Sequence, residues 1–168
     1  MNGIEEILKG IGERNGLEMA FDKNGACPLE LEDGRVMILQ ERADLNELDF
    51  VATLGSVPVE ARQEVFTRLL AANFYWNETF GATISWNADL EEAVIIYPLQ
   101  LDGATPEAVE TILTRFVELQ ASWARRFAGM VASAQEHASG ETEDDDEEDD
   151  GGASPADEGG NDHFIIHP

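Results

Sequence analysis

The spacing of apolar residues predicts a helix near the start of the chain. Within residues 3–14 apolar side chains recur at intervals of three and four, with charged side chains opposite them. The apolar stripe consists of Ile4, Ile7, Leu8 and Ile11. Gly16 follows the stripe, and glycine is a common residue just after the end of a helix.

Between residues 17 and 55 the apolar period changes to two, which is typical of strands with one covered face. The apolar runs are 17–21, 27–31, 35–40 and 48–54. Asn24-Gly25 and Asp33-Gly34 stand between runs, and glycine tolerates the positive φ that tight turns require. We therefore expect an antiparallel meander of three or four short strands.

A second helix should follow the break at residues 55–58. Pro58 suits the first turn of a helix, and helical spacing of apolar residues continues to about Tyr75. The apolar positions are Val65, Phe66, Leu69, Leu70 and Phe74.

A second hairpin is predicted from residues 82–86 and 93–101. Residues 94–97 are apolar on both faces, which indicates a central or an interface strand. Pro98 cannot donate a ladder hydrogen bond, so it indicates a bulge or a free edge.

The last predicted helix begins at Thr105-Pro106-Glu107, which combines a capping hydroxyl, a first-turn proline and a first-turn acid. Its apolar stripe continues to about residue 135, a length of about 45 Å. Because a small domain cannot cover so long a helix, we expect the far end to project or to pack on a partner.

The resulting order is α-β-β-β-α-β-β-α, an α+β fold with a twisted antiparallel sheet and three helices. We expect one folded domain over residues 1–137. Residues 138–168 are rich in glycine and acid and poor in aromatic and β-branched residues, which predicts a disordered acidic C-terminal tail.

Charge narrows the range of partners. The chain has a formal net charge of −25, and residues 141–162 hold twelve acidic residues and no Lys or Arg. Such a protein repels phosphate, so we expect neither nucleic acid nor an anionic membrane as a partner. The single cysteine, Cys27, fits a buried apolar site in a reducing cytosol. With no signal-peptide pattern and no run of about 20 apolar residues, we expect a cytoplasmic protein.

Sequence motifs for catalysis are absent. No nucleophile elbow, phosphate loop, zinc signature or dinucleotide fingerprint occurs, and the acidic tail lacks the ligand spacing of an EF-hand. The acid pairs Glu5-Glu6, Glu30/Glu32 and Glu91-Glu92 fit solvated surfaces. We therefore expect no enzyme activity, no catalytic residues, no cofactor and no metal site.

A cluster of aromatic residues around residues 74–86 suggests an interface instead. Some of these side chains belong to the core, but a domain of this size has a limited interior. Aromatic enrichment with few charges is typical of interface cores. We predict a homodimer whose interface contains Phe74, Trp76, Ile84, Trp86, Ile95 and Tyr97.

Three stretches of the chain together resemble the class I type III secretion chaperones, the Tir chaperone (CesT-like) family. They are FDKNGACPLEL, the LGSVP junction with LLAANFYWNETFGATISWNADLEEAVIIYPLQL, and GATPEAVETILTRFVELQASWARRF. Leu70-Ala71-Ala72-Asn73, Thr79 and Gly81-Ala82-Thr83 match the signature between the second helix and the following strand. The resemblance covers about residues 3–130, and the long acidic tail lies outside it.

The resemblance implies a small acidic homodimer in the bacterial cytoplasm. Such a chaperone binds the N-terminal segment of a secreted effector in extended form, keeps it secretion-competent and delivers it to the export ATPase. It implies strand addition at a sheet edge and apolar side chains in grooves. For the groove we predict Ile4, Leu8, Ile11, Leu29, Leu31, Val36 and Ile38, each of which could instead be sealed core.

An alternative function from another class is an acidic interaction or mimic protein whose tail binds a basic partner. The tail also ends in a short apolar motif, Phe164, Ile165 and Ile166. A flexible linker of about 25 residues spans about 25–30 Å, so this motif could reach a groove on the body. The motif could equally stay undocked or bind another secretion component.

Overall fold

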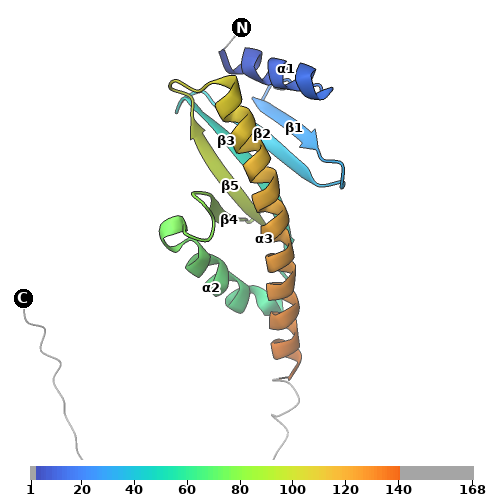
Figure 1. The fold of residues 1–168 in the computed structure, drawn as a ribbon. Helices are drawn as coiled ribbons and strands as arrows, with labels where there is room; N and C mark the ends of the chain where they lie inside the picture. Colours follow the sequence, from blue (N-terminus) through green and yellow to red (C-terminus); the bar gives the residue numbers. More distant parts are fainter. Residues whose placement is uncertain (1–2, 141–168) are drawn as a thin grey trace, which may run out of the picture.

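The computed structural model describes residues 3–140, which form three α-helices and a five-stranded sheet (Figure 1). The order α-β-β-β-α-β-β-α predicted from the sequence is confirmed. The elements are α1 Gly3–Asn15, β1 Ala26–Glu30, β2 Val36–Arg42, β3 Glu47–Ser56, α2 Arg62–Ala72, β4 Thr83–Asn87, β5 Glu92–Gln100 and α3 Pro106–Gly140. A short 3-10 turn at Val59–Ala61 precedes α2, and an irregular turn at Phe74–Trp76 follows it.

The sheet is antiparallel throughout, with strand order β1-β2-β3-β5-β4. Because side chains alternate along a strand, each cross-strand row faces one side. One row is buried and consists of Leu29, Met37, Ala52, Ile95 and Ile84. The row beside it faces the other way and consists of Pro28, Ile38, Val51, Ile96 and Thr83.

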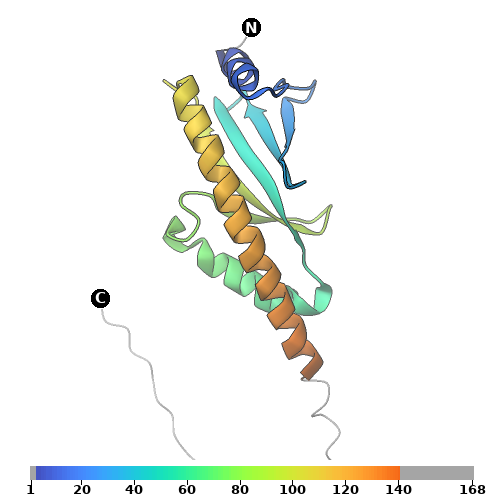
Figure 2. The same ribbon diagram turned by 45° about the vertical axis from the view of Figure 1, so that its right-hand side comes forward.

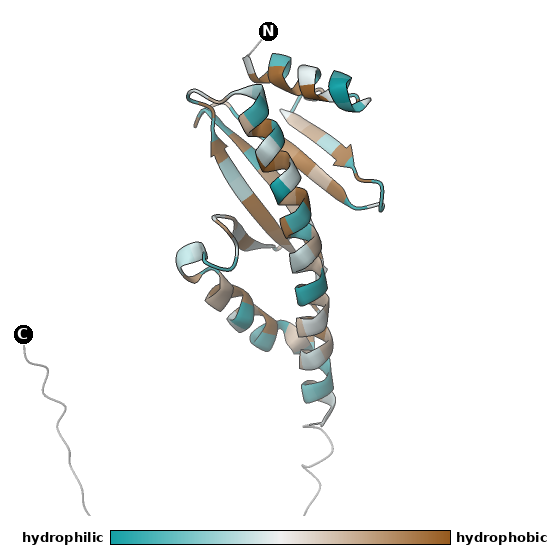
Figure 3. Cartoon of the chain, in the orientation of Figure 1, coloured by the Kyte–Doolittle hydropathy of each residue, from teal (hydrophilic) through white to brown (hydrophobic). Residues whose placement is uncertain are grey.

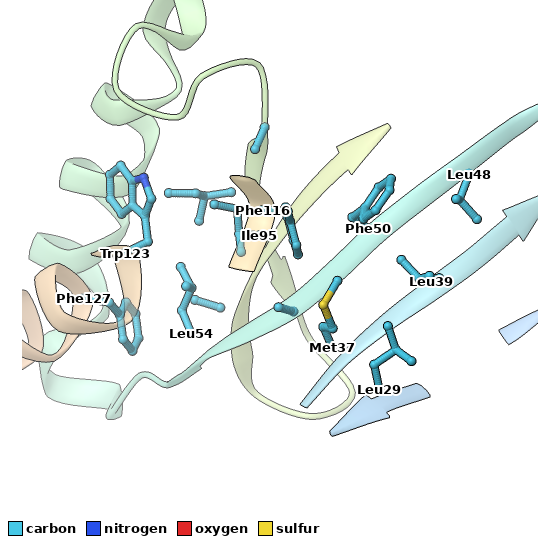
Figure 4. Close-up of a cluster of buried hydrophobic side chains, with 14 of the residues drawn as sticks. Leu29, Met37, Leu39, Leu48, Phe50, Leu54, Ile95, Phe116, Trp123 and Phe127 are labelled. Carbon is cyan, nitrogen blue, oxygen red and sulfur yellow. The ribbon is translucent and has the colours of Figure 1, made fainter. Parts of the chain in front are cut away.

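Helix α3 lies along one face of the sheet and covers it (Figures 1 and 2). Its side chains Phe116, Trp123 and Phe127 are buried among strand side chains such as Phe50 and Leu54 (Figure 4). Burying one large apolar side chain contributes about 1.5–3 kcal/mol, so this layer contributes substantially to stability.

The far end of α3 packs on the chain's own second helical segment. Ala134 is buried, the Gln135 amide bonds to Glu60, and His137 lies 3.1 Å from the Glu64 carboxylate. The expectation that this end projects or packs on a partner is wrong for the described residues. Within residues 3–140 it packs on α2 and the turn before it, because α2 folds back beside it.

Two glycines allow close packing at the ends of the sheet. A Cβ on Gly12 would lie 2.5 Å from the Leu17 carbonyl oxygen, so only glycine lets α1 approach the following segment. Gly55 has φ +136° and marks a bulge in β3, and a Cβ there would lie 3.0 Å from the Phe127 ring. Both positions therefore require glycine.

The meander has three strands, and residues 17–21, which could have formed a fourth, form none. This segment is irregular, because it turns back against α1, where the Leu17 N–H donates to the Gly12 carbonyl. Pro98 lies in β5, past the stretch of this strand that pairs with β4. That stretch ends at Ile96. The missing N–H of Pro98 faces that unpaired side, which agrees with the free-edge interpretation.

Candidate functional site

The uncovered side of the sheet carries apolar side chains, and we call it the outer face. Pro28, Ile38, Val51 and Ile96 lie side by side across four strands in one cross-strand row. Val36 and Ile38 are 48% and 37% exposed, and Val51 and Ile96 are half-buried. Brown colour on β2 and β3 in Figure 3 marks the high apolar content of these strands. This surface can accept apolar side chains from another chain.

The two sheet edges are partly blocked by the chain itself. At β1, the Asp22 carboxylate accepts a hydrogen bond from the Ala26 N–H at 2.9 Å, and the Asp22 N–H donates to the Ala26 carbonyl at 2.8 Å. Pro28, which follows on the same edge, has no N–H. At β4, the Asn73 amide bonds both the N–H and the carbonyl of Ile84, each at 2.9 Å. Edge pairing with another strand is therefore limited to short stretches.

Four exposed aromatic residues form what we call the aromatic corner between α2 and β4. Phe74, Tyr75, Trp76 and Phe80 are between 52% and 78% exposed. Tyr75, Trp76 and Phe80 have φ between 51° and 55°. This left-handed conformation is unusual for bulky residues and costs about 1–3 kcal/mol each. Strained backbone that presents aromatic rings to solvent is a candidate contact for a partner.

A cavity of about 490 Å³ lies between α3, β5 and the aromatic corner, and we call it the α3 cavity. Its apolar wall consists of Phe80, Tyr97, Ile112, Phe116, Leu119 and Trp123. Arg126 stacks on Trp123, with the guanidinium carbon 4.1 Å from the ring centroid, and pairs with Glu78. Arg115 also lines the cavity and has no hydrogen bond or ion pair within residues 3–140. Glu118 lines the cavity as well, so two bases and two acids border an apolar interior.

A second cavity of about 540 Å³ lies between α1 and residues 16–21, and we call it the α1 cavity. Leu8, Leu17 and Phe21 supply apolar lining. Its charged residues are three acids and one base: Glu5, Glu13, Glu18 and Lys9. An acidic ligand is therefore disfavoured there.

The structure divides the predicted groove residues between two sides of the sheet. Ile4, Leu8, Ile11 and Leu29 are buried in the core, and Leu31 is partly buried against it. Only Val36 and Ile38 are open to a ligand, and they lie on the outer face. Sequence reasoning missed Pro28, Val51 and Ile96, although the alternation along 48–54 was a usable signal.

The predicted dimer residues divide in a similar way. Ile84 and Ile95 are buried, while Trp86 packs on Phe66 and Tyr97 packs on Phe50. Phe74 and Trp76 are exposed, and the structure adds Tyr75 and Phe80 beside them. The tail motif Phe164, Ile165 and Ile166 lies outside the described residues, as does the acidic stretch before it.

Ionisable groups in the described part show structural roles. Burial raises the pKa of the Cys27 thiol, so Cys27 is a buried, unreactive side chain. Backbone N–H groups of Ala26 and Asn24 lower the pKa of Asp22, and Arg35 lowers that of Asp33. Within residues 3–140, no helix has the length and apolarity to cross a membrane, and no cluster of His, Cys, Asp and Glu could hold a metal ion.

Comparison with known families gives one match, over more than half of the chain. The model of the Tir chaperone protein (CesT) family matches residues 6–124, from α1 to the middle of α3. A comparison with curated protein sequences gave no match.

Several solved structures have a similar fold. A chain of the ExsC-ExsE complex superposes with a TM-score of 0.63 at 18% identity, covering 73% of this chain and 91% of that one. A chain of the HopA1-SchA chaperone-effector complex gives 0.60 at 11% identity, with 73% and 93% covered. A chain of the ExoU-SpcU complex from the type III secretion system of Pseudomonas aeruginosa gives 0.57 at 17% identity, with 76% and 97% covered. At these identities the likeness establishes the fold.

Proposed function

Because this chain belongs to the Tir chaperone protein (CesT) family, we propose that it is a type III secretion chaperone that binds a secreted effector. The likeness to chains of the HopA1-SchA chaperone-effector complex and of the ExoU-SpcU complex supports this role. The chaperone acts without catalysis in the bacterial cytoplasm. It keeps the N-terminal segment of its effector extended and secretion-competent, and it presents the effector to the secretion ATPase.

The observation that carries the binding site is the apolar row across the outer face. Neighbouring strands stand about 4.8 Å apart, so Pro28, Ile38, Val51 and Ile96 form a strip about 14 Å long. An extended segment of four to five residues, at about 3.4 Å per residue, covers that length. Its apolar side chains bury Ile38 and Val36, the two most exposed aliphatic groups of this face.

Main-chain pairing has a smaller part in this mechanism than the resemblance implies. Asp22 and Asn73 already bond the outward backbone groups of Ala26 and Ile84. By the register, the backbone N–H and carbonyl of Glu30 in β1 and of Trp86 in β4 also point away from the sheet. These groups remain available to pair with another strand. Side-chain burial on the outer face therefore supplies most of the affinity, less the entropy of ordering the effector segment.

A second copy of the chain covers the aromatic corner in this proposal. Phe74, Tyr75, Trp76 and Phe80 are exposed together, and rigid aromatic side chains are the usual hot spots of interfaces. Leu70 of α2 is also exposed and extends the apolar surface. The outer face and the corner are separate, so one dimer can offer two effector-binding faces.

Substitution of Ile38 by Asp tests the outer face. Ile38→Asp should weaken binding of the effector's N-terminal region about tenfold or more in calorimetry, because it replaces a buried aliphatic contact by a charge. Leu45→Asp is the matched control, since Leu45 is exposed in the β2–β3 turn and lies off the row. Equal binding by folded Ile38→Asp protein would contradict the assignment.

A chain ending at Gly140 addresses the alternative of an acidic mimic. This truncation removes the acidic tail and keeps all of α3. The chaperone proposal requires that effector binding survives the truncation. Complete loss of binding would favour the tail as the binding element.

A further inference from the structure

The C-terminal residues have a chemistry that the chaperone role does not require. After Gly140 the only large apolar side chains are Phe164, Ile165 and Ile166. They follow residues 141–162, which hold twelve acids and no Lys or Arg. A complementary site has to be apolar inside and cationic at its border.

The α3 cavity meets the first condition and comes nearest to the second. Aromatic and aliphatic side chains line it, and its charged lining residues are Arg115, Arg126, Glu78 and Glu118. Arg126 is already paired with Glu78, whereas Arg115 lies without an ion pair within the described residues of this strongly acidic chain. A volume of about 490 Å³ falls in the range of binding cavities and accommodates a few apolar side chains.

The other apolar surfaces are electrostatically less suitable. The α1 cavity has three acids and one base among its lining residues, which disfavours an acidic segment. On the outer face, Glu30 in β1 and Asp49 in β3 lie next to the apolar row, and both are acidic. Asp49 lies 3.5 Å from Arg42. With two bases and two acids, the α3 cavity is the least acidic of the three surfaces, so charge favours it.

The length of chain after α3 allows this contact. Arg126 and Ile112 lie 14 and 28 residues before Gly140, which is about 21 and 42 Å along the helix. Residues 141–163 number 23 and reach at most about 80 Å when fully extended. The tether can therefore run back along α3 to the cavity, and a tethered ligand binds with no bimolecular entropy cost.

We propose that Phe164, Ile165 and Ile166 dock in the α3 cavity of their own chain, with the acidic residues before them beside Arg115. The docked motif covers apolar surface next to the aromatic corner. The α3 cavity and the outer face lie on opposite sides of the sheet, so docking leaves the effector site of the proposed chaperone function open. The docking itself needs no effector and is tested without one.

Site-specific photo-crosslinking tests the docking in the full-length chain. Phe164 is replaced by p-benzoylphenylalanine, and equal amounts of isotopically labelled and unlabelled chains are mixed before irradiation. The expected result is crosslinking within one chain to residues 112–126 or to residues 78–80, mapped by mass spectrometry. No crosslink, crosslinks to the outer face, or crosslinks only between chains would overturn the proposal.

Two variants and a control sharpen the crosslinking result. Ile165→Asp should lower the yield about tenfold by removing a buried side chain, and Arg115→Glu should lower it about fivefold by reversing the border charge. Arg125→Glu is the matched control, because Arg125 also lacks an ion pair within residues 3–140 but does not line the cavity. Equal effects of Arg115→Glu and Arg125→Glu would mean that the acidic residues are attracted to α3 in general and not to the cavity. That result would overturn the proposal.

Filling of the cavity by a second copy has a different signature. In that case Leu119→Asp would convert a dimer to a monomer in sedimentation, and no crosslink from residue 164 would form within one chain. These two results together would overturn the proposal. Deletion of residues 163–168 should leave effector affinity at the outer face unchanged, because the motif and the effector occupy opposite sides of the sheet. A changed affinity would contradict this placement of the motif and overturn the proposal.

Discussion

The outer face and the aromatic corner are both apolar and exposed, but they differ in how the backbone presents them. On the outer face, Val36 and Ile38 project from a regular strand with flanking strands on both sides. At the corner, Tyr75, Trp76 and Phe80 project from a left-handed backbone. The first surface is flat and aliphatic, and the second is irregular and aromatic.

This difference suits the two surfaces to different partners. A flat aliphatic row can accept many sequences in extended form, because aliphatic contacts are non-directional. Rigid aromatic side chains at fixed, strained positions require a partner with one complementary shape, such as a second copy of the same surface. We therefore propose variable ligands for the outer face and constant self-association for the corner.

The largest expected effect is at the corner. Tyr75→Asp should raise the dimer dissociation constant about 100-fold, because it places a charge in a hot-spot interface. Aspartate tolerates the left-handed conformation at Tyr75 better than tyrosine does, so the fold should be retained. Sedimentation over a concentration series measures the change.

Leu45→Asp serves as the control for Tyr75→Asp, with the same charge change at an exposed apolar residue away from the corner. The comparison also predicts that monomeric Tyr75→Asp protein still binds one effector segment per chain. If Tyr75→Asp abolished effector binding together with dimerisation, the outer face and the corner would have to act as one binding site.

Sequence patterns could predict the elements and their order, because the helical stripes and the turn glycines are local signals. They could not predict which face of the sheet is open. Val36, Met37, Ile38 and Leu39 are all apolar, so the alternation along β2 does not distinguish the covered face from the exposed one. The covering depends on where α3 packs, which is a long-range property.

The helical stripe of α1 illustrates the same limit. Ile4, Leu8 and Ile11 were correctly placed on one side of a helix, but the pattern cannot tell whether that side meets the chain's own sheet or a ligand. The corner was hidden for another reason. Nothing local predicts a positive φ at Tyr75 or Phe80, because aromatic residues rarely adopt it.

A smaller effect is expected where the corner joins the sheet. Asn73→Ala removes two hydrogen bonds to Ile84 at the β4 edge and should lower the free energy of unfolding by about 2 kcal/mol. Denaturant unfolding measures the loss. Asn87→Ala is the control, because the Asn87 side chain accepts only from N–H groups in an exposed turn. Equal losses in the two variants would show that the β4 edge needs no such bonding.

The smallest effect concerns Asp22 at the opposite edge, and it depends on pH. The Ala26 and Asn24 N–H groups hold the pKa of Asp22 below its unfolded value of about 3.9. The ionised carboxylate therefore stabilises the fold above that value, and the contribution is lost as the pH falls through the folded pKa. Asp22→Asn lacks this titration, so its deficit in Tm against the parent should be present at pH 6 and shrink below about pH 4. A deficit that stays constant from pH 6 to pH 3 would mean that the charge of the Asp22 carboxylate does not stabilise the β1 edge.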